Sequence, residues 1–204
     1  GLPGIPEAAE TVAVARDLAL IEQTGCRAHF CGLSSARAVA MVAAAQKRGL
    51  PVSADATAHH LHLTEHDISD FDTQCHVRPP LRSKRDREAL RRALKNGVLG
   101  AICSDHQPHE PDAKLAPFAQ SEPGISALET LLPLTLKLVD ENVLELPEAI
   151  ALLTNKPAQI LGIEAGQLGV GATADVCVFD LKAPWTLTED QIRSRGHNTP
   201  FLGW

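Results

Sequence analysis

The sequence contains no tyrosine and a single methionine, and aromatic residues make up only 3% of its 204 positions. It shows no signal peptide and no apolar run long enough to span a membrane. Hydrophobic residues nevertheless account for 44% of the chain, and alanine and leucine dominate among them. The core must therefore be aliphatic, which is typical of helices packed on a buried sheet.

No stretch of the chain carries a strong excess of one charge. The 19 basic and 25 acidic residues are interspersed and give a net charge of −6. The densest basic stretch, residues 82–92, is interrupted by Asp86 and Glu88 and is typical of a solvated helix face. This pattern argues against nucleic acid as a partner.

The cysteines show no CxxC spacing. There are five, at Cys26, Cys31, Cys75, Cys103 and Cys177. An odd number without a framework indicates buried thiols in a reducing compartment. We therefore expect a cytoplasmic protein without a membrane partner.

Apolar periodicity and turn residues predict alternating strands and helices. We expect strands over residues 27–32, 51–57 and 99–104, and helices over 6–23, 35–48, 84–95, 126–139, 147–154 and 156–161. A further strand is predicted at 75–78, and another at 174–180 within a glycine-rich stretch. Strands that alternate with helices are typical of βα units on a parallel sheet.

Histidines and an aspartate follow two of these strands. His59 and His60 come after the second strand, and Asp105, His106 and His109 come after the third. In a parallel α/β barrel the residues beyond the carboxyl ends of the strands converge at one mouth. Imidazole and carboxylate groups there can bind Zn²⁺ and leave a position for an activated water. The same pattern also fits structural histidines and an Asp-His helix cap.

Several motifs read together resemble the dihydroorotase family of the amidohydrolase superfamily. They follow the family order along nearly the whole chain: Thr57-Ala-His-His-Leu61, Arg78-Pro-Pro-Leu-Arg82, Ser104-Asp-His-Gln-Pro-His109, Thr154-Asn-Lys-Pro-Ala158, Gly171-Ala-Thr-Ala-Asp-Val176 and Asn198-Thr-Pro-Phe-Leu-Gly203. The resemblance implies a (β/α)₈ barrel beside a small β-sandwich, a zinc cofactor, and interconversion of dihydroorotate and carbamoyl aspartate in pyrimidine biosynthesis. Hydantoin- and allantoin-type amidohydrolases share the scaffold, and the second and last motifs point away from them.

The resemblance also implies roles for individual residues. His59 matches a metal-ligand histidine, and Asp105 matches the carboxylate that binds metal and shuttles the proton. Arg78 and His109 match positions that contact the substrate. Residues 114–124 match a loop that lies over the substrate pocket.

One ligand of the resembled site is missing. Family members commonly carry Cys-His-Val-Ser where this chain has Cys31-Gly-Leu-Ser34, so Gly32 occupies the position of a metal-binding histidine. Strand alternation predicts that His29 and Cys31 face the opposite side from Gly32 and do not replace it. A catalytic zinc usually has three protein ligands, so this loss should weaken metal binding severely.

A closed barrel takes about 200–250 residues or more, and the strands that the resemblance matches in this chain are only the last four of its eight. We expect an α/β fold in which residues 1–163 form the C-terminal half of a TIM-type barrel and residues 164–204 form part of the β-sandwich. An open half-barrel exposes sheet edges and an apolar face. The missing N-terminal half should therefore be supplied by another segment or by a partner chain.

Two functional classes remain open. The first is a dihydroorotase-like cyclic amidohydrolase that holds zinc partly through His59 and Asp105, with catalysis impaired at Gly32. Its small-molecule substrate would be dihydroorotate or carbamoyl aspartate. The second is a non-catalytic dihydroorotase-like scaffold that binds aspartate carbamoyltransferase. In either case we expect a homo-oligomer.

Overall fold

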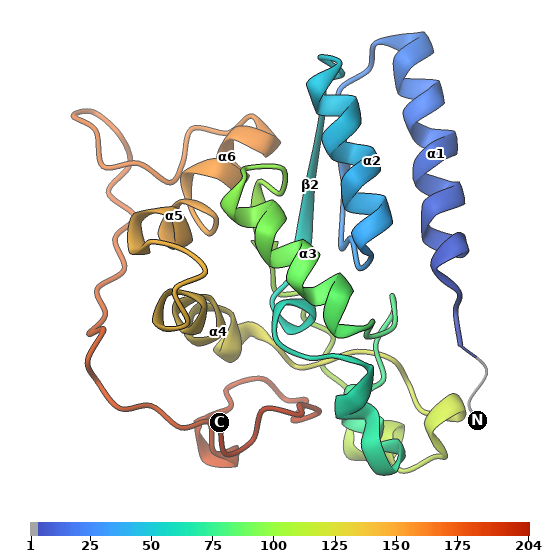
Figure 1. Cartoon of the computed structure of the whole chain (residues 1–204). Coiled ribbons are helices and arrows are strands. Elements are labelled where there is room, and N and C mark those ends of the chain that lie inside the picture. The colour runs from blue at the N-terminus through green and yellow to red at the C-terminus, as the bar shows by residue number, and fades with distance from the viewer. Residues whose placement is uncertain (1–3) are drawn as a thin grey trace.

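The computed structural model describes residues 4–204, and strands alternate with helices over the first half of the chain (Figure 1). The order is α1 (Glu7–Thr24), β1 (Ala28–Phe30), α2 (Ala36–Lys47), β2 (Val52–Thr57), α3 (Lys84–Lys95) and β3 (Ala101–Cys103). The helices α4 (Leu128–Asp140), α5 (Leu146–Ala151) and α6 (Asn155–Leu161) follow. The predicted alternation is confirmed. No helix within residues 4–204 is both long and apolar enough to cross a bilayer.

Local signals explain where the first helices begin and end. Gly25 ends α1 in the left-handed conformation, with φ 67°, which glycine adopts without steric cost. Ser35 precedes α2, and its hydroxyl accepts the amide of Ala38 at 3.2 Å. Ser83 caps α3 in the same way. These ends therefore follow from the sequence alone.

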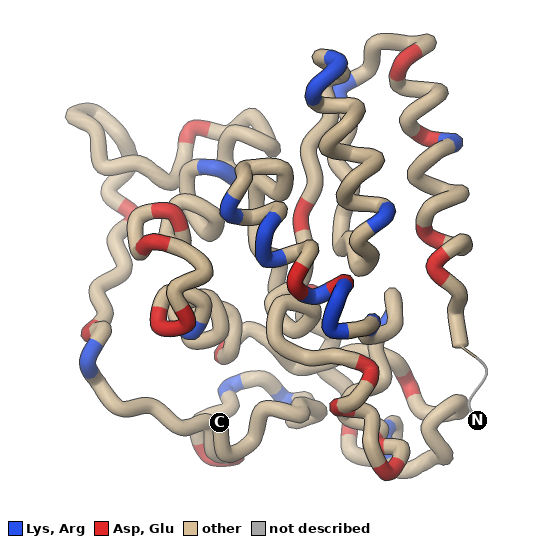
Figure 2. The backbone as a smooth tube through the Cα atoms, in the orientation of Figure 1, with Lys and Arg blue, Asp and Glu red and all other residues tan. Residues whose placement is uncertain are grey.

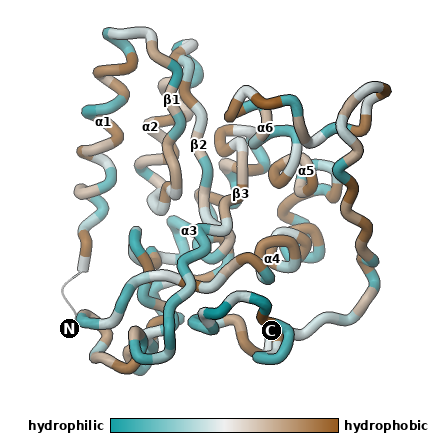
Figure 3. Tube along the Cα trace, turned by 180° about the vertical axis from the view of Figure 1, so that it is seen from behind, coloured by the Kyte–Doolittle hydropathy of each residue, from teal (hydrophilic) through white to brown (hydrophobic). Residues whose placement is uncertain are grey.

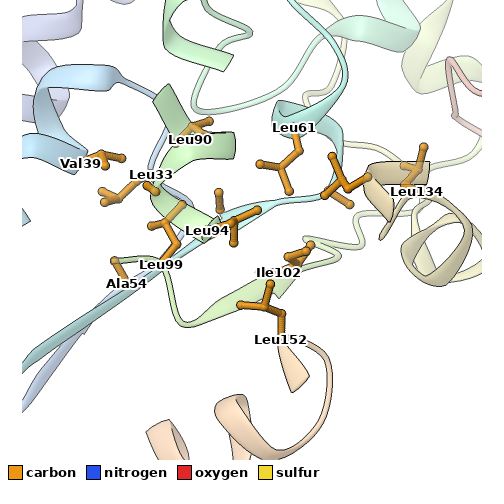
Figure 4. Close-up of a cluster of buried hydrophobic side chains, with 14 of the residues drawn as sticks. Leu33, Val39, Ala54, Leu61, Leu90, Leu94, Leu99, Ile102, Leu134 and Leu152 are labelled. Atoms are coloured by element: carbon orange, nitrogen blue, oxygen red, sulfur yellow. The ribbon is translucent and has the colours of Figure 1, made fainter. Parts of the chain in front are cut away.

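The strands found within residues 4–204 form one parallel sheet in the order β1-β2-β3. Ala54 of β2 is fully buried in one cluster with Val39 of α2 and Leu94 of α3 (Figure 4). Successive side chains of a strand alternate between its faces, so Ser53 and Asp55 lie on the face opposite Ala54. One face of the sheet thus carries the aliphatic core, and the other carries polar side chains.

The basic residues of α3 do more than cover a solvated face. They run along the whole helix (Figure 2), and two of them reach back to the segment after β2. Arg87 donates to the carbonyl of His62 at 3.1 Å, and Arg91 donates to the carbonyl of Leu61 at 2.7 Å. These bonds fix the turn that carries His59.

The strand predicted at 75–78 is wrong. Thr73–Cys75 form a 3₁₀ turn, and the residues after it are irregular. Pro79 and Pro80 have no amide hydrogen to donate to a ladder. The carbonyl of His76 instead accepts the amide of Gly124 at 2.8 Å.

The strand predicted at 174–180 is also wrong. These residues, all of which the structure describes, belong to a long irregular connection that is apolar along much of its length (Figure 3). Val176, Val178 and Leu181 are exposed. A strand forms only where a neighbour pairs with its backbone groups, and residues 4–204 supply none here. The boundary at residue 163 stays a prediction.

The cysteines are less buried than predicted. Cys75 is buried and Cys103 half-buried, whereas Cys26, Cys31 and Cys177 are exposed. All five are free thiols. The exposed three lie outside the strands and helices, where no core forms around them.

Candidate active site at the carboxyl ends of the strands

The carboxyl ends of β2 and β3 lie side by side. Thr57 pairs with Cys103, and the amide of Ala58 donates to the carbonyl of Cys103 at 2.9 Å. His59 and Asp105 each follow this pair by two residues. The structure therefore brings both predicted ligands to one edge of the sheet, and their shared metal stays a prediction.

His59 is buried, with 1% of its surface exposed, and neither ring nitrogen has a hydrogen-bond partner within residues 4–204. Burial, together with the adjacent His60, lowers the pKa of His59 well below its usual value. The ring is therefore neutral and has a free lone pair, which is the form that binds metal. A buried polar group without a partner is costly, and a metal ion would satisfy it. His59 thus fits the metal that the resemblance implies.

His60 is also buried, but both of its ring nitrogens have hydrogen-bond partners. Its Nδ1 accepts the hydroxyl of Thr57 at 2.7 Å, and its Nε2 donates to the carbonyl of Pro80 at 3.3 Å. Burial lowers its pKa to about 4. Both ring nitrogens are occupied by the fold, which supports a structural role.

Asp105 has a left-handed backbone, with φ 47°, which is uncommon for a residue other than glycine. Its amide lies 3.3 Å from the sulfur of Cys103, and its Oδ1 accepts the side-chain amide of Gln107 at 3.0 Å. The next residue, His106, accepts the amide of Ala127 at the start of α4. The turn thus holds the Asp105 carboxylate by Oδ1, and Oδ2 has no hydrogen-bond partner among residues 4–204.

The predicted substrate-binding residues, Arg78 and His109, lie near the loop that residues 114–124 form. His109 donates through Nε2 to the carbonyl of Pro123 at 3.0 Å, and its amide donates to Asn198 at 2.7 Å. Arg78 is exposed, and its charge contributes to the lowered pKa of His76, after burial and the nearby Lys114. The structure joins His109 to the loop and leaves Arg78 exposed, and contact of either residue with a substrate stays a prediction.

The loop formed by residues 114–124 is anchored near both of its ends. Thr73 donates its hydroxyl to the carbonyl of Lys114 at 2.7 Å, and the buried ammonium of Lys114 donates to the carbonyl of Glu122 at 2.6 Å. Burial lowers the pKa of Lys114 to about 8. The ring of His76 lies 2.9 Å from the hydroxyl of Ser121. The loop therefore has a defined position against residues 73–76, and its place over a substrate pocket stays a prediction.

Gly32 lies two residues beyond the end of β1 and has φ 63°. Its amide donates to Oδ1 of Asp55 at 2.6 Å. A Cβ at this position would lie 3.9 Å from Cγ2 of Thr57, so a side chain here would start toward the polar face of β2. Glycine supplies no side-chain ligand here, and the ligand position that the resemblance implies stays a prediction.

The prediction that His29 and Cys31 face away from this side is wrong. His29 pairs with Ser53 and shares its polar face, opposite the core residue Ala54. The strand ends at Phe30, so alternation does not extend to the left-handed Gly32. Asp55 was not predicted as a site residue. Its position between Ala54 and Ala56, in an otherwise apolar part of a strand, was a usable signal.

These residues define part of a TIM-type barrel with polar groups at the carboxyl edge of its sheet. A family profile described as "Amidohydrolase family" matches residues 4–202, and the chain belongs to this family. The predicted α/β fold of a partial barrel is confirmed.

Relatives and solved structures agree with this assignment. The chain is 53% identical over 203 residues to a "Dihydroorotase-like protein" of Pseudomonas putida and 46% identical over 204 residues to a "Dihydroorotase" of Syntrophus aciditrophicus. Each match covers 100% of this chain and 48% of the relative, so the chain spans about half their length. A structure described as "L-Hydantoinase (Dihydropyrimidinase) from Arthrobacter aurescens" superposes with a TM-score of 0.91 at 29% identity, covering 97% of this chain and 45% of that one.

Proposed function

We propose that the full-length protein is a dihydroorotase-like cyclic amidohydrolase whose catalysis is impaired by the glycine at position 32. The observation that carries this proposal is a contrast between two positions at one edge of the sheet. His59 offers two unpartnered ring nitrogens in a buried setting, whereas Gly32 offers no ligand. The relatives named dihydroorotase support dihydroorotate and carbamoyl aspartate as the substrate pair.

His59 and Asp105 would hold the metal together with ligands from outside this chain. A bound zinc ion lowers the pKa of water and supplies a nucleophile at neutral pH. The Asp105 carboxylate would take the proton of the attacking water and deliver it to the leaving ring nitrogen as the amide bond breaks. Arg78 would bind the substrate carboxylate through charge-assisted hydrogen bonds, and His109 would contact the same carboxylate. With glycine at position 32, the protein would hold the ion less tightly, and the reaction would be slower.

A non-catalytic scaffold that binds aspartate carbamoyltransferase is the second candidate. Two observations favour it: the missing ligand at Gly32, and the higher identity to the protein named dihydroorotase-like than to the one named dihydroorotase. One lost ligand is enough to disable a catalytic zinc site. Binding of substrate separates the two candidates, because a pure scaffold has no need of a substrate pocket.

Calorimetric titration of the full-length protein with dihydroorotate tests the proposal. We expect binding that weakens about 10-fold or more in Arg78→Ala, because a charge-assisted hydrogen bond contributes roughly 1.5–3 kcal/mol. Arg85→Ala, at an exposed position on α3, serves as the control and should bind like the wild type. No binding of dihydroorotate, together with co-elution of the protein with aspartate carbamoyltransferase, would favour the scaffold instead.

A further inference from the structure

We propose that His29, Cys31 and Asp55 form a three-ligand site for a borderline-soft divalent metal ion such as Zn²⁺. This site shares no ligand with the pair His59 and Asp105. It does not rest on the proposed hydrolase activity. The three residues come from the end of β1 and from the polar face of β2.

The distances between the candidate ligand atoms suit one ion. One nitrogen of His29, the sulfur of Cys31 and one oxygen of Asp55 all lie within 4.8 Å of one another. Nε2 of His29 lies 2.9 Å from Oδ2 of Asp55. Tetrahedral bonds of about 2.0–2.3 Å place ligand atoms roughly 3.3–3.8 Å apart. Small side-chain rotations therefore convert this arrangement into a coordination shell.

Neighbouring groups orient two of the three ligands. Oδ1 of Asp55 accepts the amide of Gly32 at 2.6 Å, which directs Oδ2 toward His29. Nδ1 of His29 lies 2.8 Å from the hydroxyl of Ser53, which leaves Nε2 as the nitrogen that faces the site. A hydrogen bond from the second ring nitrogen to a polar group is the usual support of a metal-binding histidine.

The charge of the site also favours a divalent cation. The carboxylates of Asp55 and Asp105 surround Cys31 with negative charge and, after burial, raise the pKa of its thiol. On binding, the thiol would release its proton to solvent and form a metal–sulfur bond. One carboxylate, one thiolate and one neutral imidazole then balance the two charges of the ion. An ion pair between His29 and Asp55 would explain their distance, but it gives the thiol no role.

The ligand types and the degree of burial define the class of ion. Thiolate and imidazole ligands select zinc-like metals over Mg²⁺ or Ca²⁺, which prefer oxygen ligands. The side chain of Asp55 is 9% exposed and that of His29 is 22% exposed, while Cys31 is exposed. The ion can therefore enter from the Cys31 side. Three protein ligands leave a fourth position for water or another small ligand.

Titration of the full-length protein with Co²⁺ tests this site without an activity assay. We expect one equivalent to produce a sulfur-to-cobalt charge-transfer band in the near ultraviolet. Cys31→Ser should abolish the band, and Asp55→Asn should weaken Co²⁺ affinity about 10- to 100-fold. The asparagine oxygen can still accept the amide of Gly32, and circular dichroism would verify that each variant folds.

Two control variants separate this site from the proposed catalytic pair. Cys26→Ser changes an exposed thiol before β1 and should leave the band unchanged. His59→Ala should also leave it unchanged, whether or not the hydrolase proposal holds. The inference is overturned if no band forms, if the band persists in Cys31→Ser, or if it requires Cys26 or His59.

Discussion

The imidazole rings of His59 and His60 lie 4.7 Å apart between centroids, yet the fold binds only one of them. His60 is held by Thr57 and Pro80, and His59 has no partner within residues 4–204. A protein gains no stability from an unpartnered buried imidazole. The exception at His59 is therefore typical of a side chain retained for a ligand.

Replacing each histidine with leucine should have opposite effects on stability. His59→Leu removes an unsatisfied polar group and should raise the free energy of unfolding of the metal-free protein by about 1–2 kcal/mol. His60→Leu breaks two hydrogen bonds and leaves Pro80 without its donor, so it should lower that free energy by about 1–3 kcal/mol. Urea denaturation with a chelator measures both. A loss in His59→Leu as large as that in His60→Leu would contradict a ligand role.

Asn198 should control the order of the segment that carries His109. Its side chain accepts the amide of His109 at 2.7 Å and donates to the carbonyls of Gln107 and Gly124 at 2.9 and 3.0 Å. Asn198→Ala should cost about 2–4 kcal/mol, since it removes three hydrogen bonds at a buried position. Hydrogen exchange at the amide of His109 should accelerate. Gln167→Ala, at an exposed position, should change neither quantity.

The stability of the protein should fall in mild acid partly because of His62. Burial lowers its pKa to about 4 from 6.5, and its Nε2 donates to the carbonyl of Leu134 at 2.8 Å. Between pH 6.5 and 4 the unfolded chain binds a proton that the folded chain does not, so stability falls as the pH falls. The contribution lost by pH 4.5 is about 2–3 kcal/mol.

Glutamine is the matched substitution, because it can donate to the same carbonyl and does not titrate. His62→Gln should reduce the difference in unfolding free energy between pH 7.5 and 4.5 by that amount, measured by denaturant titration. The other histidines are the same in the wild type and in His62→Gln, so their contributions to the pH dependence cancel in the comparison. An unchanged pH dependence would show that His62 is solvated when folded.

Most of the helices and the parallel strands could be predicted because their signals are local. Ser35, Ser83 and Gly25 mark helix ends through contacts within a few residues. The strand predicted at 174–180 failed because a strand depends on a distant partner that its own residues do not reveal.

Part of the candidate site was also predictable from the sequence. His59 and Asp105 follow neighbouring strands, and the pairing of those strands brings them to one edge. The face of the sheet on which His29 of β1 lies was not predictable. It depends on which face of the neighbouring strand β2 packs against the helices, and Ala54 lies on that packed face. The left-handed backbone at Gly32 also interrupts the alternation of side chains. The prediction for His29 and Cys31 had assumed that this alternation continues to position 32.

Position 32 should tolerate a side chain at a measurable cost in stability. Its φ of 63° is unfavourable for other residues by about 1–2 kcal/mol, whereas nothing lies closer than 3.9 Å to an added Cβ. Gly32→Ala should therefore lower the free energy of unfolding by that amount without disrupting the fold. Gly169→Ala, in open space without a positive φ, is the control and should change stability little. Equal effects of the two variants would show that Gly32 is not held in this conformation.

The most direct test of the account is the metal content and dihydroorotate hydrolysis of the full-length protein with and without Gly32→His. The comparison is made in a Cys31→Ser background, so that metal bound through the thiol does not contribute, and Gly32→Ala controls for backbone strain. We predict little metal and slow turnover with glycine, and a gain in metal with at least about a 10-fold rise in turnover with histidine. Stoichiometric metal and unimpaired turnover with glycine at position 32, and no gain from histidine, would contradict the account.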